Sequence, residues 1–289
     1  MKKTAFACVP LAVLFYLYFP TLREIAEICW NNEDYSHGIL LPFISAYFIW
    51  NDWPLIRRRI EAAALDVPRL SISGLLLLIV GLLIFVLGEI GNLMFIRWLS
   101  LFPALIGTLF LILGTGAAKP FVAPLLINFM AKPLPDSLIP KFFFPLQVLA
   151  ARVSARTLEF FGVPVYLKGN IIEIPGMQLM VEEACSGLRS LMALLTVALI
   201  VIYSVELPIY AKLLLLFGSV FIAIFLNVVR VASTGLLAHF YDPRAATGFF
   251  HTFSGMVVFV LGLVILYAFG RLLHRLTGNR EKSNSGGAQ

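Results

Sequence analysis

Three side chains in this sequence could together carry out covalent acyl transfer: a thiol, an imidazole and a guanidinium. Cys185 stands in the run Glu-Glu-Ala-Cys-Ser-Gly-Leu-Arg at 182–189, where a polar segment meets a long apolar one. Arg230 and His251 lie near the ends of two later apolar segments. A thiolate attacks carbonyl carbon, an imidazole transfers protons near neutral pH, and a guanidinium stabilises developing negative charge. The combination predicts cysteine-based acyl transfer at a membrane surface.

The neighbours of Cys185 favour a reactive thiol. Ser186 and Gly187 are small and leave room for a substrate beside the sulfur. If a helix begins here, its free amides and its dipole favour a thiolate and could hold an oxyanion. Glu182 and Glu183 oppose a thiolate, so a cationic partner is required. The alternatives are a buried small residue or a disulfide with Cys29.

Arg230 and His251 each have a supporting residue one turn away. Asn227 precedes Arg230 on the same helical face, and Ser254 follows His251 on its own face. Two polar groups on one face of an apolar helix predict a lined cavity. The alternative for Arg230 is an anchor that reaches the membrane interface, and for His251 an interfacial histidine. His239 is a rival for the role of His251.

Two residues near the start of the chain join the candidate group. Ser36 and His37 stand where an apolar segment begins, and Ser36 is the candidate helix cap. We expect them on the same side of the membrane as the other three. The predicted substrate-binding or supporting residues are therefore His37, Ser36, Ser186, Gly187, Asn227 and Ser254, with neither a metal site nor a cofactor predicted.

Composition identifies the class of protein. Of 289 residues, 60% are hydrophobic and 13% are charged, and the mean hydropathy is +0.92. Soluble domains are closer to half apolar and a quarter charged. The net charge of +6 lies largely in short flanks beside apolar segments, as cytoplasmic loops of membrane proteins require. We therefore expect a polytopic membrane protein in contact with lipid, and no nucleic-acid partner.

The apolar segments predict an all-α polytopic fold with about eight transmembrane helices. The basic flanks at residues 2–3, 57–59 and 271–282 place both termini in the cytoplasm. We expect a single transmembrane domain over residues 1–275, followed by a polar, disordered tail at 276–289. The expected spans are about residues 4–20, 38–53, 71–88, 93–113, 115–131, 186–205, 208–237 and 251–273.

Residues 132–184 form an extracytoplasmic insert. Residues 141–161 have the pattern of an amphipathic helix, which suits either the membrane interface or the cover of a small subdomain. Short strand-like runs follow at 165–167, 171–174 and 177–181, separated by the turn signals Lys-Gly-Asn and Pro-Gly. A β-hairpin there would bring Cys185 to the membrane surface.

Four motifs in this order resemble the exosortase/archaeosortase family of polytopic membrane transpeptidases. They are Tyr-Ser-His-Gly at 35–38, Ala-Cys-Ser-Gly-Leu-Arg-Ser-Leu at 184–191, Asn-Val-Val-Arg at 227–230 and His-Thr-Phe-Ser-Gly at 251–255. The resemblance covers about residues 20–270. The third catalytic position is histidine, as in bacterial exosortases, where archaeal relatives tend to have arginine.

The resemblance implies a multi-pass protein of the bacterial inner membrane with its active site at the extracytoplasmic face. It implies a thiol protease or transpeptidase with Cys185 as nucleophile, Arg230 as charge stabiliser and His251 as acid and base. Its substrates would be exported proteins with a C-terminal sorting signal: a Pro-Glu-Pro-like motif, a transmembrane helix and a basic tail. A glycan or lipid acceptor linked to exopolysaccharide is implied as well. A membrane transporter and a lipid or glycan acyltransferase remain the alternatives.

Overall fold

The computed structural model describes residues 2–63, 71–180, 187–242 and 248–285. These residues form two compact units, and the boundary between the units in the sequence follows Pro135. The units are described separately below. The prediction of one domain over residues 1–275 with a disordered tail stays a prediction. Within the described residues the helix α10 runs to Ser285.

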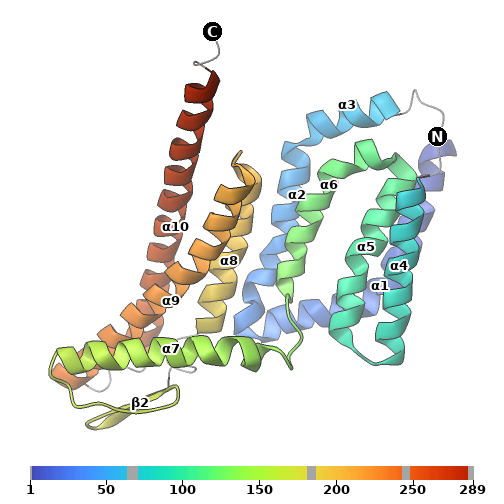
Figure 1. Ribbon diagram of the computed structural model, residues 1–289. Helices are drawn as coiled ribbons and strands as arrows, with labels where there is room; N and C mark the ends of the chain where they lie inside the picture. Colours follow the sequence, from blue (N-terminus) through green and yellow to red (C-terminus); the bar gives the residue numbers. More distant parts are fainter. Residues whose placement is uncertain (1, 64–70, 181–186, 243–247, 286–289) are drawn as a thin grey trace. The chain divides into compact units, whose positions relative to one another are not determined.

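The first unit is entirely helical (Figure 1). Its elements are α1 (Lys2–Asn31), the 3-10 helix η1 (Glu33–Leu40), α2 (Leu41–Asn51), α3 (Trp53–Ala63), α4 (Ile72–Ile90), α5 (Met94–Leu113), α6 (Thr115–Ile127) and the 3-10 helix η2 (Asn128–Ala131).

Small residues let α4 and α5 pack closely. A Cβ at Gly81 would fall 2.8 Å from the Cα of Ala104, and one at Gly74 would fall 3.0 Å from the carbonyl oxygen of Gly107. Within lipid, burying apolar surface contributes little to the association of helices. Transmembrane helices therefore associate through close van der Waals packing, which small residues allow. Tyr18 joins α1 to α5 through a hydrogen bond of 2.9 Å with the Ser100 hydroxyl.

The two ends of the first unit carry opposite charge. The N-terminus, α3 and the start of α6 lie at one end (Figure 1), and α3 carries residues 57–59, all arginine. At the other end Arg97 of α5 binds Glu24 of α1 at 3.0 Å and Glu89 of α4 at 3.2 Å. This separation agrees with a cytoplasmic N-terminus under the positive-inside rule.

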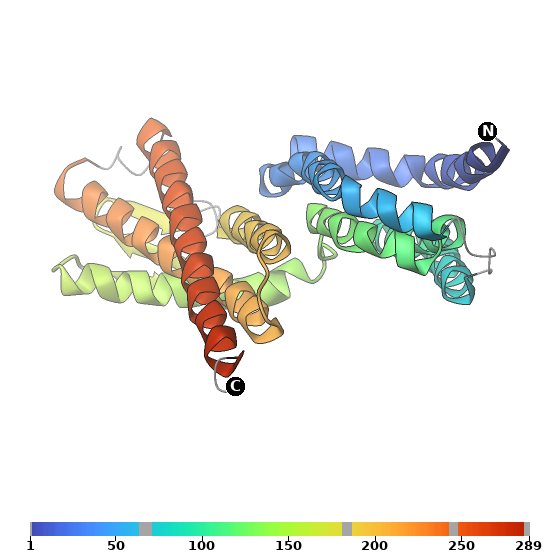
Figure 2. The ribbon, with the colours of Figure 1, turned by 90° about the horizontal axis from the view of Figure 1, so that it is seen from above.

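The second unit combines four helices with a small sheet. Its elements are α7 (Ile139–Phe160), β1 (Tyr166–Lys168), β2 (Ile171–Ile174), β3 (Met177–Met180), α8 (Gly187–Ser204), α9 (Ile209–Phe240) and α10 (Gly248–Ser285). Figures 1 and 2 agree that α7 runs crosswise to α8, α9 and α10, at the end where α8 and α10 begin.

The predicted β-hairpin is a three-stranded antiparallel sheet in the order β1-β2-β3. Lys168 pairs with Ile171 and Ile174 pairs with Met177, so each loop has two residues. Gly169 has φ +65° and Gly176 has φ +86°. Glycine adopts these left-handed values without a steric penalty, which explains why both turn signals contain it.

The sheet, α7 and the last part of α9 share one core, which we call the cap. Val231 and Ala238 of α9 pack there against Leu158 of α7 and Ile172 of β2. A Cβ at Gly235 would fall 3.0 Å from Leu158, so α9 passes close beneath α7. The buried residues of the cap are Ala150, Ala151, Leu158, Val163, Ile172, Ile174, Leu179, Val231 and Ala238.

Every predicted span coincides with a helix, and the all-α polytopic membrane fold is confirmed. Among the described residues, however, only five helices are long and apolar enough to span alone: α1, α4, α5, α9 and α10. The segment Glu33–Asn51 with Trp53–Ala62, bent by 61°, would make a sixth. The helices α6 and α8 are too short to qualify by themselves, because α6 has 13 residues and the apolar part of α8 runs over Arg189–Ser204.

Two local predictions were wrong. The first span does not end at residue 20: α1 continues to Asn31, because the charges in its last turns find partners, as in the Arg23–Glu27 pair of 2.8 Å. Ser36 is no helix cap. It lies inside η1, where its hydroxyl donates to Glu33 O, and the cap is Asn32, whose side chain accepts from the amide of residue 34.

The amphipathic helix predicted at 141–161 is present as α7, and its buried face is made mainly of small residues. Small residues fill the contact with the rest of the second unit, so this helix covers a subdomain. Several of the large apolar residues remain exposed, including Phe142, Leu149, Val153 and Phe161. The buried residues are Phe143, Ala150, Ala151, Ser154, Ala155 and Leu158.

Candidate functional site

Arg230 is buried within the second unit, with only 6% of its surface exposed. It lies 21 residues after Ile209 at the start of α9, which is about 31 Å of helix, close to the thickness of the hydrocarbon layer. The next residue, Val231, already belongs to the core of the cap. A lipid-facing anchor would be exposed on the helix surface, and Arg230 is not.

Helix α10 packs directly against the Arg230 guanidinium. A Cβ built at Gly255 would fall 2.8 Å from Nη2 and 3.0 Å from Cζ of Arg230. His251 precedes Gly255 by one turn on α10, which puts its backbone at about 6 Å along the helix axis from this contact. The rival His239 lies nine residues after Arg230 on α9, about 14 Å along the axis. The side chain of His251 is outside the described part of the structure.

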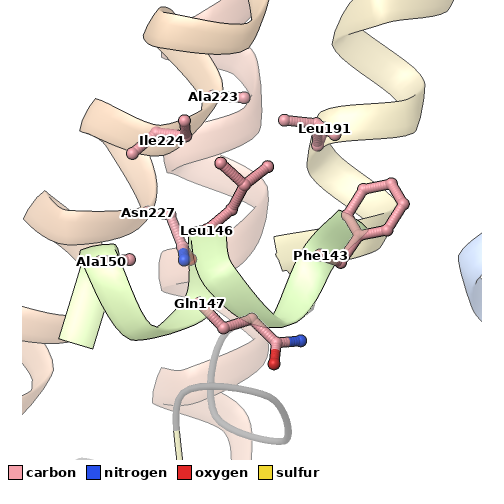
Figure 3. A pocket seen from close by; sticks show the side chains of 8 residues that line it. All are labelled: Phe143, Leu146, Gln147, Ala150, Leu191, Ala223, Ile224 and Asn227. Atoms are coloured by element: carbon pink, nitrogen blue, oxygen red, sulfur yellow. The ribbon is translucent and has the colours of Figure 1, made fainter. Parts of the chain in front are cut away.

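Asn227 lies one turn before Arg230 and lines a pocket. Its Oδ1 atom is buried and has no hydrogen-bond partner among the described residues. The pocket is bounded by α7, α8 and α9 and has an empty volume of about 350 Å³, including the part open to solvent (Figure 3). The lining of this pocket is mainly apolar and includes Asn227 but not Arg230, so the predicted polar cavity shared by these two residues stays a prediction. The lining residues are Phe143, Leu146, Gln147, Ala150, Leu191, Ala223, Ile224 and Asn227.

Cys185 and Ser186 lie outside the described residues, so their predicted roles stay predictions. The strand before them ends at Met180, and α8 begins at Gly187, two residues after Cys185. The predicted start of a helix beside the thiol is therefore present. The start of α8, the end of α9 and the start of α10 all lie at the same end of the second unit, beside α7 (Figure 1). Ser254 is partly buried on α10, next to Gly255.

His37 and Ser36 lie in the first unit, and their membership of a shared site stays a prediction. Within that unit the ring of His37 has a packing role, since Nε2 lies 3.2 Å from Met130 O of η2. Gly38 fits between α1 and η2: a Cβ there would fall 2.5 Å from Cys29 Sγ and 3.2 Å from Ala131. The Tyr-Ser-His-Gly motif thus holds three elements of the first unit together.

Tyr35 and Lys132 complete this packing. Tyr35 is buried, and the ammonium of Lys132 lies 4.8 Å from the centre of its ring. Cys29 is a free thiol, 2% exposed, with its sulfur 3.9 Å from Ala131 O. The alternative of a disulfide between Cys29 and Cys185 is not tested, because Cys185 lies outside the described residues.

Reasoning from sequence missed two features of this region. The spacing of four placed Gly255 on the same helical face as His251, but the contact of Gly255 with the Arg230 guanidinium was missed. The pocket was missed because most of its walls, such as Leu146 and Ile224, are apolar residues like hundreds of others in membrane helices. Within the described residues no group of three or more His, Cys, Asp or Glu side chains could hold a metal ion.

Comparison with known proteins gives one match. The sequence model of the family described as transmembrane exosortase (Exosortase_EpsH) matches residues 29–268, which include all four motifs. Neither the curated proteins nor the solved structures contain a match to the chain. Because the matched range covers more than half of the sequence, this multi-pass membrane protein belongs to the transmembrane exosortase family.

Proposed function

We propose that this protein is a thiol peptidase and transpeptidase that processes the C-terminal sorting signals of exported proteins. Membership of the transmembrane exosortase family supports the reaction class. The observation that carries the proposal is the burial of Arg230 against Gly255, one turn after His251 on α10. A desolvated guanidinium there can stabilise the charge that develops on a substrate carbonyl oxygen.

The proposed reaction has two steps. The Cys185 thiolate attacks the scissile carbonyl carbon, the amide C–N bond breaks, and His251 gives a proton to the departing amine. An acceptor nucleophile or water then gives its proton to His251 and attacks the thioester, which releases the Cys185 thiolate and restores the starting protonation of the pair. Dividing the reaction in this way replaces one difficult step by two easier ones. Arg230 stabilises the oxyanion in both steps.

The proposed location is the inner membrane of a bacterium, with the cap and the site at the extracytoplasmic face. The opposite charges at the two ends of the first unit support this orientation. The substrate's transmembrane helix would be held in the bilayer, and its scissile bond would reach the level of Arg230. The acceptor would be a glycan or lipid at the membrane surface, in keeping with a link to exopolysaccharide.

The test is co-expression with tagged candidate substrates, followed by mass spectrometry of their C-termini. We expect cleavage by the wild type and none by Cys185→Ser, with a protein thioester trapped at Cys185 when the acceptor is withheld. Processing that survives Cys185→Ser would overturn the proposed function. A lipid thioester in place of a protein one would instead identify an acyltransferase.

A further inference from the structure

We propose that the pocket between α7, α8 and α9 is a substrate subsite, which takes one apolar side chain on the membrane side of the cleaved bond. This inference rests on the proposed function and adds the location and chemistry of a specificity site. The pocket is the hollow lined by Leu146, Ala150, Ile224 and Asn227 together with the other residues named above. Its empty volume of about 350 Å³ includes space open to solvent, so the hollow itself is small, which suits a single side chain rather than a larger ligand.

The position of the pocket along α9 decides which part of the substrate it meets. Ala223, Ile224 and Asn227 precede Arg230 on α9 and so lie toward the membrane interior. In the proposed substrates the transmembrane helix follows the cleaved bond. A substrate whose carbonyl oxygen lies at Arg230 must therefore present its next residues, on the leaving-group side, to the pocket. The residue that enters would be among the first few after the cleaved bond.

The lining of the pocket defines the chemistry of that residue. Phe143, Leu146, Leu191 and Ile224 offer apolar surface from three helices, which favours an apolar side chain. Asn227 is one of two polar residues in the lining, and its side chain faces this apolar surface. Figure 3 shows its side chain beside Leu146 and Ala150.

Gln147 is the other polar residue of the lining, and it is already engaged. Its Oε1 accepts a hydrogen bond of 3.4 Å from Asn170 in the β1–β2 turn, and in Figure 3 its carboxamide points away from Asn227. Asn227 Oδ1, in contrast, is buried without a partner among the described residues. A buried acceptor without a donor is unfavourable, and a peptide N–H of the substrate would supply the donor. Asn227 would thus fix the substrate backbone while the apolar walls select the side chain.

The experiment alters the size of the pocket and measures which substrate side chains the enzyme prefers. Leu146 is partly buried on α7 and can be varied, so Leu146→Ala enlarges the pocket and Leu146→Phe fills it. The substrates form a series in which Ala, Val, Leu or Phe is placed in turn at each of the last two residues before the cleaved bond and each of the first four after it. The matched control is Leu149→Ala on the same helix, because Leu149 is 45% exposed and does not line the pocket.

We expect Leu146→Ala to shift the kcat/KM ratio of large over small side chains at least tenfold in favour of large ones. Leu146→Phe should shift it the opposite way, at one substrate position only, and Leu149→Ala should leave it within a factor of two. Asn227→Leu removes the acceptor at similar volume. It should raise KM at least tenfold while the kcat for saturating substrate changes less.

Three results would overturn the subsite. They are an unchanged preference in both Leu146 variants, a shift at residues before the cleaved bond, or a lipid acyl chain found cross-linked to a benzophenone amino acid placed at position 146. The proposed function is tested separately in the same assay. If cleavage still depends on Cys185 but the preferences do not move, the subsite fails and the proposed function stands.

Discussion

Gly255 of α10 lies against the guanidinium of Arg230, so close that a Cβ at position 255 would fall 2.8 Å from Nη2. The neighbour that would have to move is a charged group within a buried contact. Only a residue without a side chain leaves the guanidinium in its present place. The glycine of the His-Thr-Phe-Ser-Gly motif therefore sets the position of the arginine of another motif.

The first prediction follows from this contact. Gly255→Ala should displace the Arg230 guanidinium and lower substrate processing at least about tenfold, equivalent to about 1.4 kcal/mol of barrier. The matched control is Gly270→Ala on the same helix, where a Cβ would meet Val201 at 3.2 Å and no charged group. The rate of processing of a tagged substrate, compared at equal abundance of the variants in the membrane, tests this prediction. Equal rates in the two variants would show that the position of Arg230 does not limit catalysis.

The second prediction concerns the chemistry of Arg230 itself. Lysine keeps the charge but loses the planar fork of donors. We expect Arg230→Lys to insert normally and to process substrate at least about tenfold more slowly, about 1.4 kcal/mol of barrier or more. Arg271→Lys, at an exposed position of α10, serves as the control. A rate for Arg230→Lys within a factor of two of the wild type would assign Arg230 to anchoring.

The third prediction separates the two cysteines discussed above. Cys185→Ala and Cys185→Ser should abolish processing, whereas Cys29→Ala should retain it, because Cys29 is a buried free thiol in the first unit. Peptide mapping without reductant tests whether the two cysteines form a disulfide. A Cys29–Cys185 disulfide in active protein would contradict the nucleophile assignment.

The fourth prediction tests the packing role of Gly38. Gly38→Ala should destabilise the protein by about 1–3 kcal/mol, the usual cost of overpacking, because its Cβ would fall 2.5 Å from Cys29 Sγ. Thermal unfolding in detergent measures this. The double variant Cys29→Ala with Gly38→Ala should recover part of the loss. It would not recover all of it, since the contact of 3.2 Å with Ala131 remains. Failure of Cys29→Ala to recover any stability would mean that the strain lies elsewhere.

The fifth prediction is topological. In a cysteine-free background, Lys168→Cys in the exposed end of β1 should react with an impermeant maleimide from the extracytoplasmic side, and Arg58→Cys in α3 only from the cytoplasm. The basic residues of α3 and the acidic far end of the first unit give the reason. Labelling of position 168 from the cytoplasm alone would invert the orientation and remove the extracytoplasmic site.

The sequence predicted the helices well because long apolar runs have one stable solution in a membrane. It failed where partners far along the chain decide the structure. The first span was predicted to end near residue 20, yet α1 continues to Asn31, and Glu24 within it binds Arg97 of α5 at 3.0 Å. The sequence pattern did not reveal the contact face of α7, because Ala150 and Ala151 give no hydropathy signal, although both are buried in the core shared with α9.

The candidate site could likewise be predicted from the sequence only in part. Spacing along α9 was enough to place Asn227 and Arg230 together, since residues one turn apart share a face. Nothing in the sequence could reveal that Gly255 touches Arg230, because that contact depends on how α10 crosses α9. The placement of His37 with the other residues remains a prediction, and so does the nucleophilic role of Cys185.

The length of α9 has a consequence for how this chain tolerates insertions and deletions. One continuous helix of 32 residues carries Asn227 in the pocket, Arg230 against Gly255 and Ala238 in the cap. Inserting one residue between positions 230 and 238 would turn everything beyond it by about 100° and translate it by about 1.5 Å. Ala238 would then face away from the sheet while Arg230 stayed in place. The number of residues between these two positions is therefore fixed by helical phase.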